Sequence, residues 1–331
     1  MAKKERFGKF VLLEELGSSG LGTEHRAAKL AAGGVLERLV LLIRLAPALS
    51  ANDAFTGALL EQAKAASLLH GPNILKLIAI GRVERAYYLA YEHVEGKSLK
   101  ALMQRSRRDA VPLTPDHALV ITSKICSALD YAHGKQGRLG GHVHVHGCLT
   151  PAAVLVTHDG EVKLRGFGVW AAGAAEAGAV AADEQGYLAP EQVKDRAADA
   201  QSDVFGAGAL LFEMLTGQPL AEGDPAPQVK RARAGGGGEG EALPQPMAEI
   251  LTRALAAPAG ARFPEMAELR QAIDALLYSG EFNPTTFNLA FFMHSLFRQD
   301  IEREARSLAE ERAASYAEYW ADEAPRPEIP R

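Results

Sequence analysis

The spacing of apolar residues changes from a β-like to a helical period near residue 98, and this change limits the possible folds more than any other feature. Before it, short alternating runs with glycines between several of them predict an antiparallel sheet: FGKFVLLEEL, GTEHRAAKL, RLVLLIRL and RAYYLAYEHV. Within this region, the segment from Asp53 to His70 has helical spacing. Further helices are predicted from Thr114-Pro115 and over about Asp203 to Leu215. The pattern predicts an α+β chain with a sheet-rich first lobe, carrying one helix, and a mostly helical second lobe.

The same pattern divides the chain into a first lobe over residues 1–95, a second lobe over 96–279 and a helical extension over 280–331. Glycine and proline accumulate between Pro219 and Pro246, which predicts a mobile surface loop. The extension concentrates large apolar side chains that need a partner surface: Phe287, Phe291, Phe292, Leu296 and Phe297. We expect them to pack on the second lobe, with self-association or another protein as alternatives. Farther along, coiled-coil-like spacing is too short and Ala-rich to insist on: Ile301, Ala305, Leu308 and Ser315.

Composition excludes several classes of function. Lys and Arg total 36 against 41 Asp and Glu, a net charge of -5, so no basic excess favours nucleic acid or an acidic membrane. The two cysteines, Cys126 and Cys148, are too few for a disulfide framework, and no signal-peptide-like start is present. The most apolar window is interrupted by Arg44 and Pro47, well short of the ~20 residues of a membrane span. We expect a cytoplasmic protein without a transmembrane helix.

Five stretches, taken in order, resemble landmarks of the bacterial eukaryotic-like Ser/Thr protein kinase family: LGSSGLGTEHRA, LVLLIRL, HGCLTPAAVLV, VKLRGFGV and LAPE. Their order over roughly residues 7 to 278 makes the resemblance specific. It implies a two-lobed protein-kinase-like fold. It also implies that residues which maintain the architecture of the family are kept: His146, Glu191, Asp203 and Arg262.

The nucleotide loop that this resemblance implies departs from the family pattern. Gly17 and Gly22 are kept, Ser19 stands at the middle glycine, and Glu24 stands where a Val covers the adenine. A carboxylate at Glu24 would be buried against an apolar base and would repel phosphates. We therefore expect no bound cofactor.

The resemblance assigns Arg44 to the phosphate-pairing Lys and Glu61 to its helix-borne partner. A guanidinium does not replace an ammonium at such a site, because it is a bulky planar fork. We expect Arg44 to pair with Glu61, or with Glu24, and to occupy the phosphate site. Tyr91 is expected to narrow the entrance to the pocket, and Glu92 to Val94 to form the hinge.

The catalytic positions have changed most. By resemblance, Cys148 replaces the Asp that accepts the hydroxyl proton, Thr150 replaces a Lys, and Ala153 replaces the Asn that holds a metal ion. Gly166, in Gly-Phe-Gly, replaces the Asp that holds the magnesium. Base and metal ligands are lost together, and each tenfold loss of rate corresponds to ~1.4 kcal/mol. We expect neither a metal site nor phosphoryl transfer.

Regulation by phosphorylation of the activation loop is also expected to be lost. Between Gly168 and Pro190 there is no Ser or Thr, and Tyr187 is the only hydroxyl. Gly147 stands where an Arg would bind the phosphate group.

These departures imply a pseudokinase that acts as a signalling scaffold or allosteric regulator by binding proteins, such as an active kinase or a second copy of itself. The first alternative is a metal-independent nucleotide switch or an atypical transferase that uses Arg44 and Cys148. The second is a structural support for the C-terminal helix.

Three groups have both a functional and a structural interpretation, and we adopt the structural one for each. Alternating histidines in GHVHVHG could bind zinc, but a loop with one packing His is expected: His142, His144 and His146. Cys148 could be a nucleophile, but a packed small residue is expected. An arginine cluster could bind an acidic partner, but solvated side chains are expected: Arg105, Arg107 and Arg108.

Overall fold

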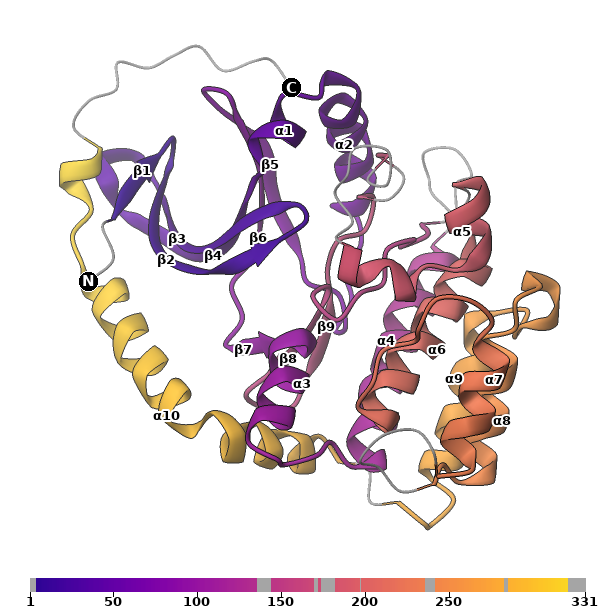
Figure 1. Cartoon of the computed structure of the whole chain (residues 1–331). Helices are drawn as coiled ribbons and strands as arrows, with labels where there is room; N and C mark the ends of the chain where they lie inside the picture. Colours follow the sequence, from indigo (N-terminus) through magenta and orange to yellow (C-terminus); the bar gives the residue numbers. More distant parts are fainter. Residues whose placement is uncertain are drawn as a thin grey trace.

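The computed structural model describes residues 4–135, 144–169, 172–173, 182–196, 198–235, 242–282 and 285–320. Figure 1 shows two lobes, one rich in strands and one rich in helices, with a long C-terminal helix running beside both. The predicted two-lobed α+β architecture is present.

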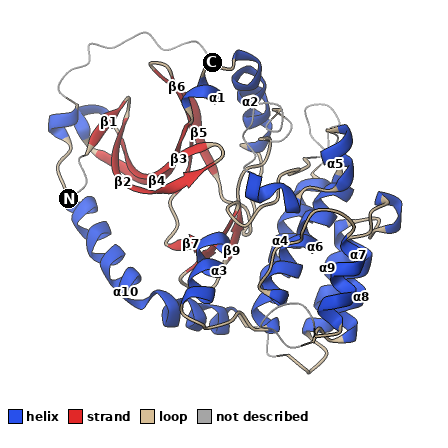
Figure 2. Ribbon diagram, viewed as in Figure 1, coloured by secondary structure: helices blue, strands red, loops and turns tan. Residues whose placement is uncertain are grey.

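The N-lobe is built on a six-stranded antiparallel sheet in the order β1-β2-β3-β4-β6-β5, which curves strongly (Figure 2). Its strands are β1 (Glu5–Phe7), β2 (Phe10–Ser19), β3 (Gly22–Leu30), β4 (Leu36–Leu45), β5 (Leu77–Val83) and β6 (Ala86–Glu92). The short helices α1 (Pro47–Ser50) and η1 (Ala32–Gly34) lie at its ends. Helix α2 (Asp53–Ala66) is capped by Asn52, whose side chain accepts from Phe55 N, and it buries Phe55 and Leu59. The predicted sheet and its one long helix are therefore present.

The C-lobe surrounds one almost fully buried helix, α6 (Ala200–Thr216). The other helices are α3 (Leu99–Arg108), α4 (Pro115–Gly134), α5 (Pro190–Asp195), α7 (Pro225–Arg233), α8 (Gln245–Ala254) and α9 (Met266–Leu277), with the 3-10 turns η2 (Ala182–Tyr187) and η3 (Ala259–Ala261). A small sheet lies next to the N-lobe, with strands β7 (Gly96–Ser98), β8 (Val154–Thr157) and β9 (Val162–Leu164). Thr114 precedes α4 as its N-cap, as the Thr-Pro signal predicts. Asp199 caps α6, and Gly217, with φ 72°, ends it.

The predicted mobile loop between Pro219 and Pro246 is wrong over part of its length. Helix α7 forms inside it, because Asp224 accepts from Ala226 N at its start and Val229 and Ala232 are buried on α8. Proline at the first turn of a helix costs no hydrogen bond, so a proline-rich sequence does not exclude this helix. Residues 236–241 lie outside the described residues.

Two of the arginines expected to be solvated bind acidic side chains instead. Arg105 contacts Asp300 of the C-terminal helix at 3.2 Å and lies over the Phe297 ring. Arg107 donates to the buried Glu213 at 2.5 Å. Only Arg108 remains mainly in solvent, with its neighbour Asp109 as partner. The first two are part of the fold because acidic groups of other elements face them.

Helix α10 (Thr286–Ala313) begins on the C-lobe and is kinked at Phe297, where φ is -117° and ψ is 17°. Its first half joins the C-lobe core through five side chains: Leu289, Phe292, Met293, Leu296 and Phe297. Phe287 and Phe291 point away from that core and are exposed. The extension thus packs on the second lobe, and of the five large apolar side chains named for it, Phe287 and Phe291 remain exposed.

Neighbouring phenylalanines on α10 give a direct test of this docking. Phe292 is 6% exposed and Phe291 is 69% exposed. We expect Phe292→Ala to lower the free energy of unfolding by about 3–5 kcal/mol, since it removes a buried ring and leaves a cavity. Phe291→Ala should change it by less than about 0.5 kcal/mol. Urea unfolding of both variants measures the difference, and equal effects would contradict the docked position of α10.

Candidate functional site

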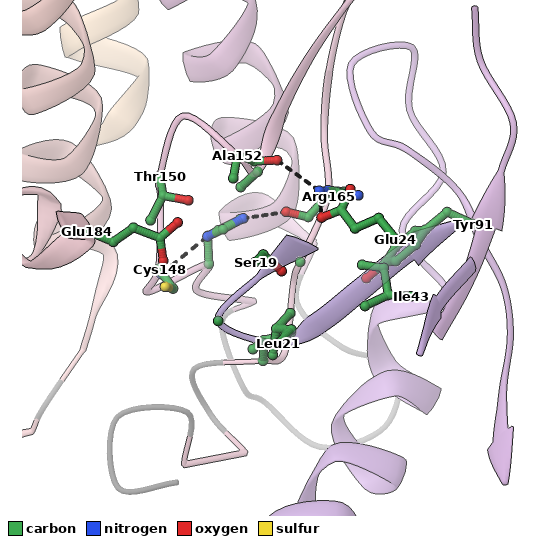
Figure 3. A pocket seen from close by; sticks show the side chains of 15 residues that line it. Ser19, Leu21, Glu24, Ile43, Tyr91, Cys148, Thr150, Ala152, Arg165 and Glu184 are labelled. Carbon is green, nitrogen blue, oxygen red and sulfur yellow. Dashed lines mark hydrogen bonds and ion pairs between the residues drawn. The ribbon is translucent and has the colours of Figure 1, made fainter. Parts of the chain in front are cut away.

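The cleft between the lobes is narrow. It is lined by the turn between β2 and β3, by β4 and β6, by the loop before β8 and by the residues after β9 (Figure 3). About 60 Å³ of free space remains in it. That space holds a few water molecules. Tyr91 of β6 is buried at the cleft, and burial raises the pKa of its hydroxyl to about 12. Its side chain lines the pocket, and whether it narrows the entrance stays a prediction.

Arg44 does not lie in the cleft, and the prediction that it occupies the phosphate site is wrong. Its guanidinium is on the other face of β4, 3.2 Å from the Glu5 carboxylate and 5.1 Å from the Phe7 ring centre. The cleft is lined instead by the buried Ile43. Side chains of a strand alternate between faces, so a shift of one residue in the assignment moves the side chain to the other face. An apolar side chain thus stands where the family pattern requires a cation.

Glu61 is also outside the cleft, so no Arg44–Glu61 pair exists. Its side chain is 71% exposed and accepts from Lys64 at 2.7 Å. The next residue, Gln62, is the one that faces the cleft loop: a β-carbon placed on Gly168 would lie 3.0 Å from Gln62 Cβ. The helix face was misassigned by one residue, which is a rotation of ~100°.

An ion pair absent from the sequence predictions occupies the cleft. Arg165, 6% exposed, donates from Nη2 to Glu24 Oε1 at 2.5 Å and to the Ala152 carbonyl at 3.1 Å. Figure 3 shows the two side chains meeting between the lobes. Glu24 therefore pairs with Arg165 and not with Arg44. The sequence contains one indication of this pair. A buried carboxylate needs a cation as partner, and Arg165 follows the apolar strand β9 directly.

The loop that carries Cys148 is held by one buried carboxylate, that of Asp203. Asp203 accepts from the backbone N–H groups of His146 at 2.8 Å and Gly147 at 2.7 Å. It also lies 2.8 Å from His133 Nε2.

The structure brings Glu191 and Arg262 together through two bonds of 2.7 and 2.9 Å. Hinge residue Glu92 contacts Lys163 at 3.2 Å, and partly buried Val94 packs on the N-lobe core.

His146 and Cys148 are arranged for packing and not for nucleophilic chemistry. His146 Nε2 is 2.8 Å from the Arg165 carbonyl, so it carries the proton, and Nδ1 accepts from Cys148 N at 3.3 Å. The ring also packs edge-on against Phe167. Burial lowers the pKa of His146 and raises the pKa of the Cys148 thiol to about 12. The thiol therefore stays protonated near neutral pH, which opposes its use as a nucleophile.

The cleft residues do not fit a magnesium nucleotide. Magnesium takes oxygen ligands, and neither Gly166 nor Ala153 has a side-chain oxygen. Thr150 is buried beside them. The carboxylate of Glu24 is already neutralised by Arg165. Ile43, which also lines the pocket, offers no charge to a phosphate. Among the described residues, no group of three or more His, Cys, Asp and Glu side chains could hold a metal ion. His142 of the histidine run lies outside the described residues.

Comparison with known proteins identifies the family. Residues 48–236, more than half of the chain, match the model of the protein kinase domain. The chain therefore belongs to the protein kinase family. Over 222 residues it is 31% identical to the probable serine/threonine-protein kinase PknB of Lactococcus lactis. This alignment covers 66% of this chain and 33% of PknB. It is 29% identical to the serine/threonine-protein kinase PrkC of Bacillus subtilis over 225 residues, 67% of this chain and 32% of PrkC.

Solved structures support the same fold. The kinase domain of Mycobacterium tuberculosis PknI superposes with a TM-score of 0.62 at 22% identity, over 84% of this chain and 99% of that domain. The chain spans about a third of the length of the curated relatives named above. In the part of the chain that the structure describes, no helix is both long and apolar enough to cross a membrane.

The Glu24–Arg165 pair makes a testable contribution to stability. Glu24→Gln leaves a buried guanidinium without its counter-charge, so we expect a loss of about 3–5 kcal/mol in the free energy of unfolding. Glu15→Gln, on the exposed part of β2, is the matched control and should cost less than about 0.5 kcal/mol. Denaturant unfolding of both proteins measures this. Equal, small losses would mean that Glu24 and Arg165 do not form a buried pair.

His93 of the hinge should make stability depend on pH. Burial and the nearby Arg26 and Arg312 lower its pKa to about 4, against the opposing charges of Glu304 and Glu95. A lowered pKa means that the folded protein resists protonation of His93, whereas the unfolded chain takes up the proton near pH 6.5. The free energy of unfolding therefore falls as the pH falls from 6.5 through 4. Over this window the unfolding free energy of the natural protein should fall more steeply than that of His93→Gln, by up to ~1.4 kcal/mol per pH unit.

The exposed His70 provides the control for this measurement. His70→Gln should retain the steep decline, which chemical denaturation at a series of pH values would record. Identical slopes for His93→Gln and the natural protein would rule out the assigned role of His93.

Proposed function

We propose that this member of the kinase family is a pseudokinase, which does not transfer phosphoryl groups and acts by binding other proteins in signalling. The observation that carries the proposal is the Glu24–Arg165 ion pair in the cleft. It brings a carboxylate and a bulky guanidinium into the volume that a nucleotide would need. About 60 Å³ of free space is left beside it.

The chemistry of phosphoryl transfer supports the same conclusion. Such catalysis consists of positioning and of neutralising charge with metal ions and cationic side chains. Here Gly166 and Ala153 offer no metal ligand, and the protonated Cys148 is no base. Ile43 and Gln62 cannot form the cation–carboxylate pair of an active kinase. These losses add up, since each factor of ten in rate is ~1.4 kcal/mol.

The supporting framework, in contrast, is complete. Asp203 accepts two backbone hydrogen bonds from the loop that carries Cys148. The Arg262 side chain donates two hydrogen bonds to the Glu191 carboxylate. A fold that keeps its framework without catalytic groups is suited to present surfaces, which supports a role as scaffold or allosteric partner. The exposed Phe287 and Phe291 are candidates for such a surface. The partner could be an active kinase, another signalling protein or a second copy of this chain.

A second candidate function is a nucleotide switch that works without metal. One observation favours it: Arg165 Nη1 is buried and has no hydrogen-bond partner among the described residues. An anion could accept from it. The related idea of a transferase using Arg44 and Cys148 has less support, because Arg44 lies outside the cleft and the Cys148 thiol has a raised pKa.

Calorimetric titration with ATP, with and without magnesium and up to millimolar nucleotide, tests the proposal. We expect no heat of binding and no rise in melting temperature. Saturating ligand at a hundredfold excess over its dissociation constant would stabilise the fold by ~2.7 kcal/mol, so binding would be visible in both measurements. Metal-independent binding would replace the proposal by the nucleotide switch.

A variant separates the loss of one ligand from the loss of the whole site. Gly166→Asp restores the missing carboxylate, and a β-carbon there would meet only ordinary contacts with His146 at 3.6 Å, although φ of 97° disfavours it. We expect this variant, like the natural protein, to transfer no radiolabelled phosphate to itself or to a general protein substrate. Transfer by the natural protein would overturn the assignment as a pseudokinase.

A further inference from the structure

The segment from Thr286 to Trp320, called the C-terminal strap below, is attached to both lobes. It comprises α10, three linking residues and the turn η4 (Ala317–Tyr319). Figure 1 shows α10 leaving the C-lobe, passing the connection between the lobes and reaching the side of the N-lobe sheet. Its far end therefore contacts a lobe that its near end does not.

The attachment to the N-lobe centres on Arg26 of β3, which is 1% exposed. Its Nε and Nη2 donate to the two carboxylate oxygens of Glu311 at 2.7 and 2.9 Å. Glu14 accepts from the same guanidinium at 2.5 Å, and Glu304 lies 3.8 Å away. Two of these three carboxylates come from the strap, and Glu311 is 285 residues from Arg26 along the chain. Without the strap, a buried cation of the N-lobe would lose its two-pronged partner.

Apolar contacts reinforce this attachment. Tyr316 is fully buried in a cluster with Val11, Leu13 and Ala28 on the outer face of the sheet, and its hydroxyl donates to the Glu311 carbonyl at 2.8 Å. The backbone approaches Gly34 closely: a β-carbon there would lie 2.9 Å from Ala317 Cα. The strap end is thus seated in a fitted surface and not merely near it.

The middle of the strap is fixed at the connection between the lobes. Lys97 of β7 donates to Glu304 at 2.8 Å, and Arg312 donates to Glu95 at 3.2 Å. Below this point, Phe292 and Phe297 anchor the first half of α10 in the C-lobe core. Beyond the kink at Phe297, the second half of α10 is attached at its start through Phe297 and farther along through Glu304 and Glu311. This half behaves as a strut, because a helix cannot change its length without breaking its own hydrogen bonds.

We propose that the C-terminal strap fixes the two lobes at one relative opening, with Arg26–Glu311 as its latch. Two lobes joined by one connecting segment are free to rotate about it unless another element ties them together. Here the opening of the cleft is coupled to the seating of residues 314–320 on the N-lobe. The inference does not depend on whether the cleft binds nucleotide.

Two variants on the same helix test the latch. Glu311→Gln keeps the shape of the side chain and removes the charge that faces Arg26. Glu302→Gln is the matched control, because Glu302 is exposed and pairs with its neighbour Arg298 on the same helix. Amide exchange at Tyr319 and Trp320, whose N–H groups bond within the strap end, reports its release. Spin labels on Arg85→Cys and Val193→Cys, both exposed and in different lobes, report the distance between lobes.

We expect one narrow distance for the natural protein and for Glu302→Gln. Glu311→Gln should speed exchange at Tyr319 and Trp320 by at least about tenfold and broaden the distance towards larger values. An unchanged distance with a released strap end would overturn the strut, and unchanged exchange would overturn the latch. If Glu311→Gln does not fold, Glu311→Asp takes its place, since its shorter side chain keeps the charge but cannot keep both bonds to Arg26, and the same outcomes decide.

Discussion

The carboxylate of Asp203 holds together the part of the molecule on which the cleft depends. It is 1% exposed at the start of α6, the most buried helix, and it accepts from two successive backbone N–H groups of the loop that carries Cys148. A buried charge with several donors is costly to disturb, so the loop has one conformation. That conformation directs His146 towards the Arg165 carbonyl and so fixes the backbone from which Arg165 reaches Glu24. The geometry of the cleft is thus maintained by hydrogen bonds around one buried carboxylate.

Charge, rather than backbone shape, distinguishes this cleft from the arrangement of charges that phosphoryl transfer uses. A productive site needs negative ligands for metal ions and positive charge for phosphates, each at its own place. In this chain the cation and the carboxylate are both present, as Arg165 and Glu24, but they neutralise each other across the cleft. Each of the two charges can be removed from water only because the other compensates it, since either one alone would be a buried, unpaired charge. The pair therefore fills part of the cleft with two mutually neutralised charges.

The sequence was sufficient for the architecture but not for the orientation of individual side chains. Changes in hydrophobic period revealed the lobes, and ordered motifs located the loop at Cys148 and the Glu191–Arg262 pair. Arg44 and Glu61 were each assigned one residue away from the side chain that faces the cleft. A single sequence constrains such a register poorly, because LVLLIRL is apolar on both faces of the strand. Arg165 was missed because its role depends on Glu24, which is 141 residues distant and contacts it only in the folded chain.

The C-terminal strap shows the same dependence on distant partners at a larger scale. Arg26 is placed by β3 in a position that no side chain of the N-lobe except Glu14 neutralises directly in the described structure. Its remaining partners, Glu304 and Glu311, belong to the second half of α10, whose first half is docked on the C-lobe. The electrostatic completion of one lobe therefore requires the packing of the other. A surface that spans both lobes can then keep a constant shape, and a preorganised surface binds a partner at a smaller entropic cost.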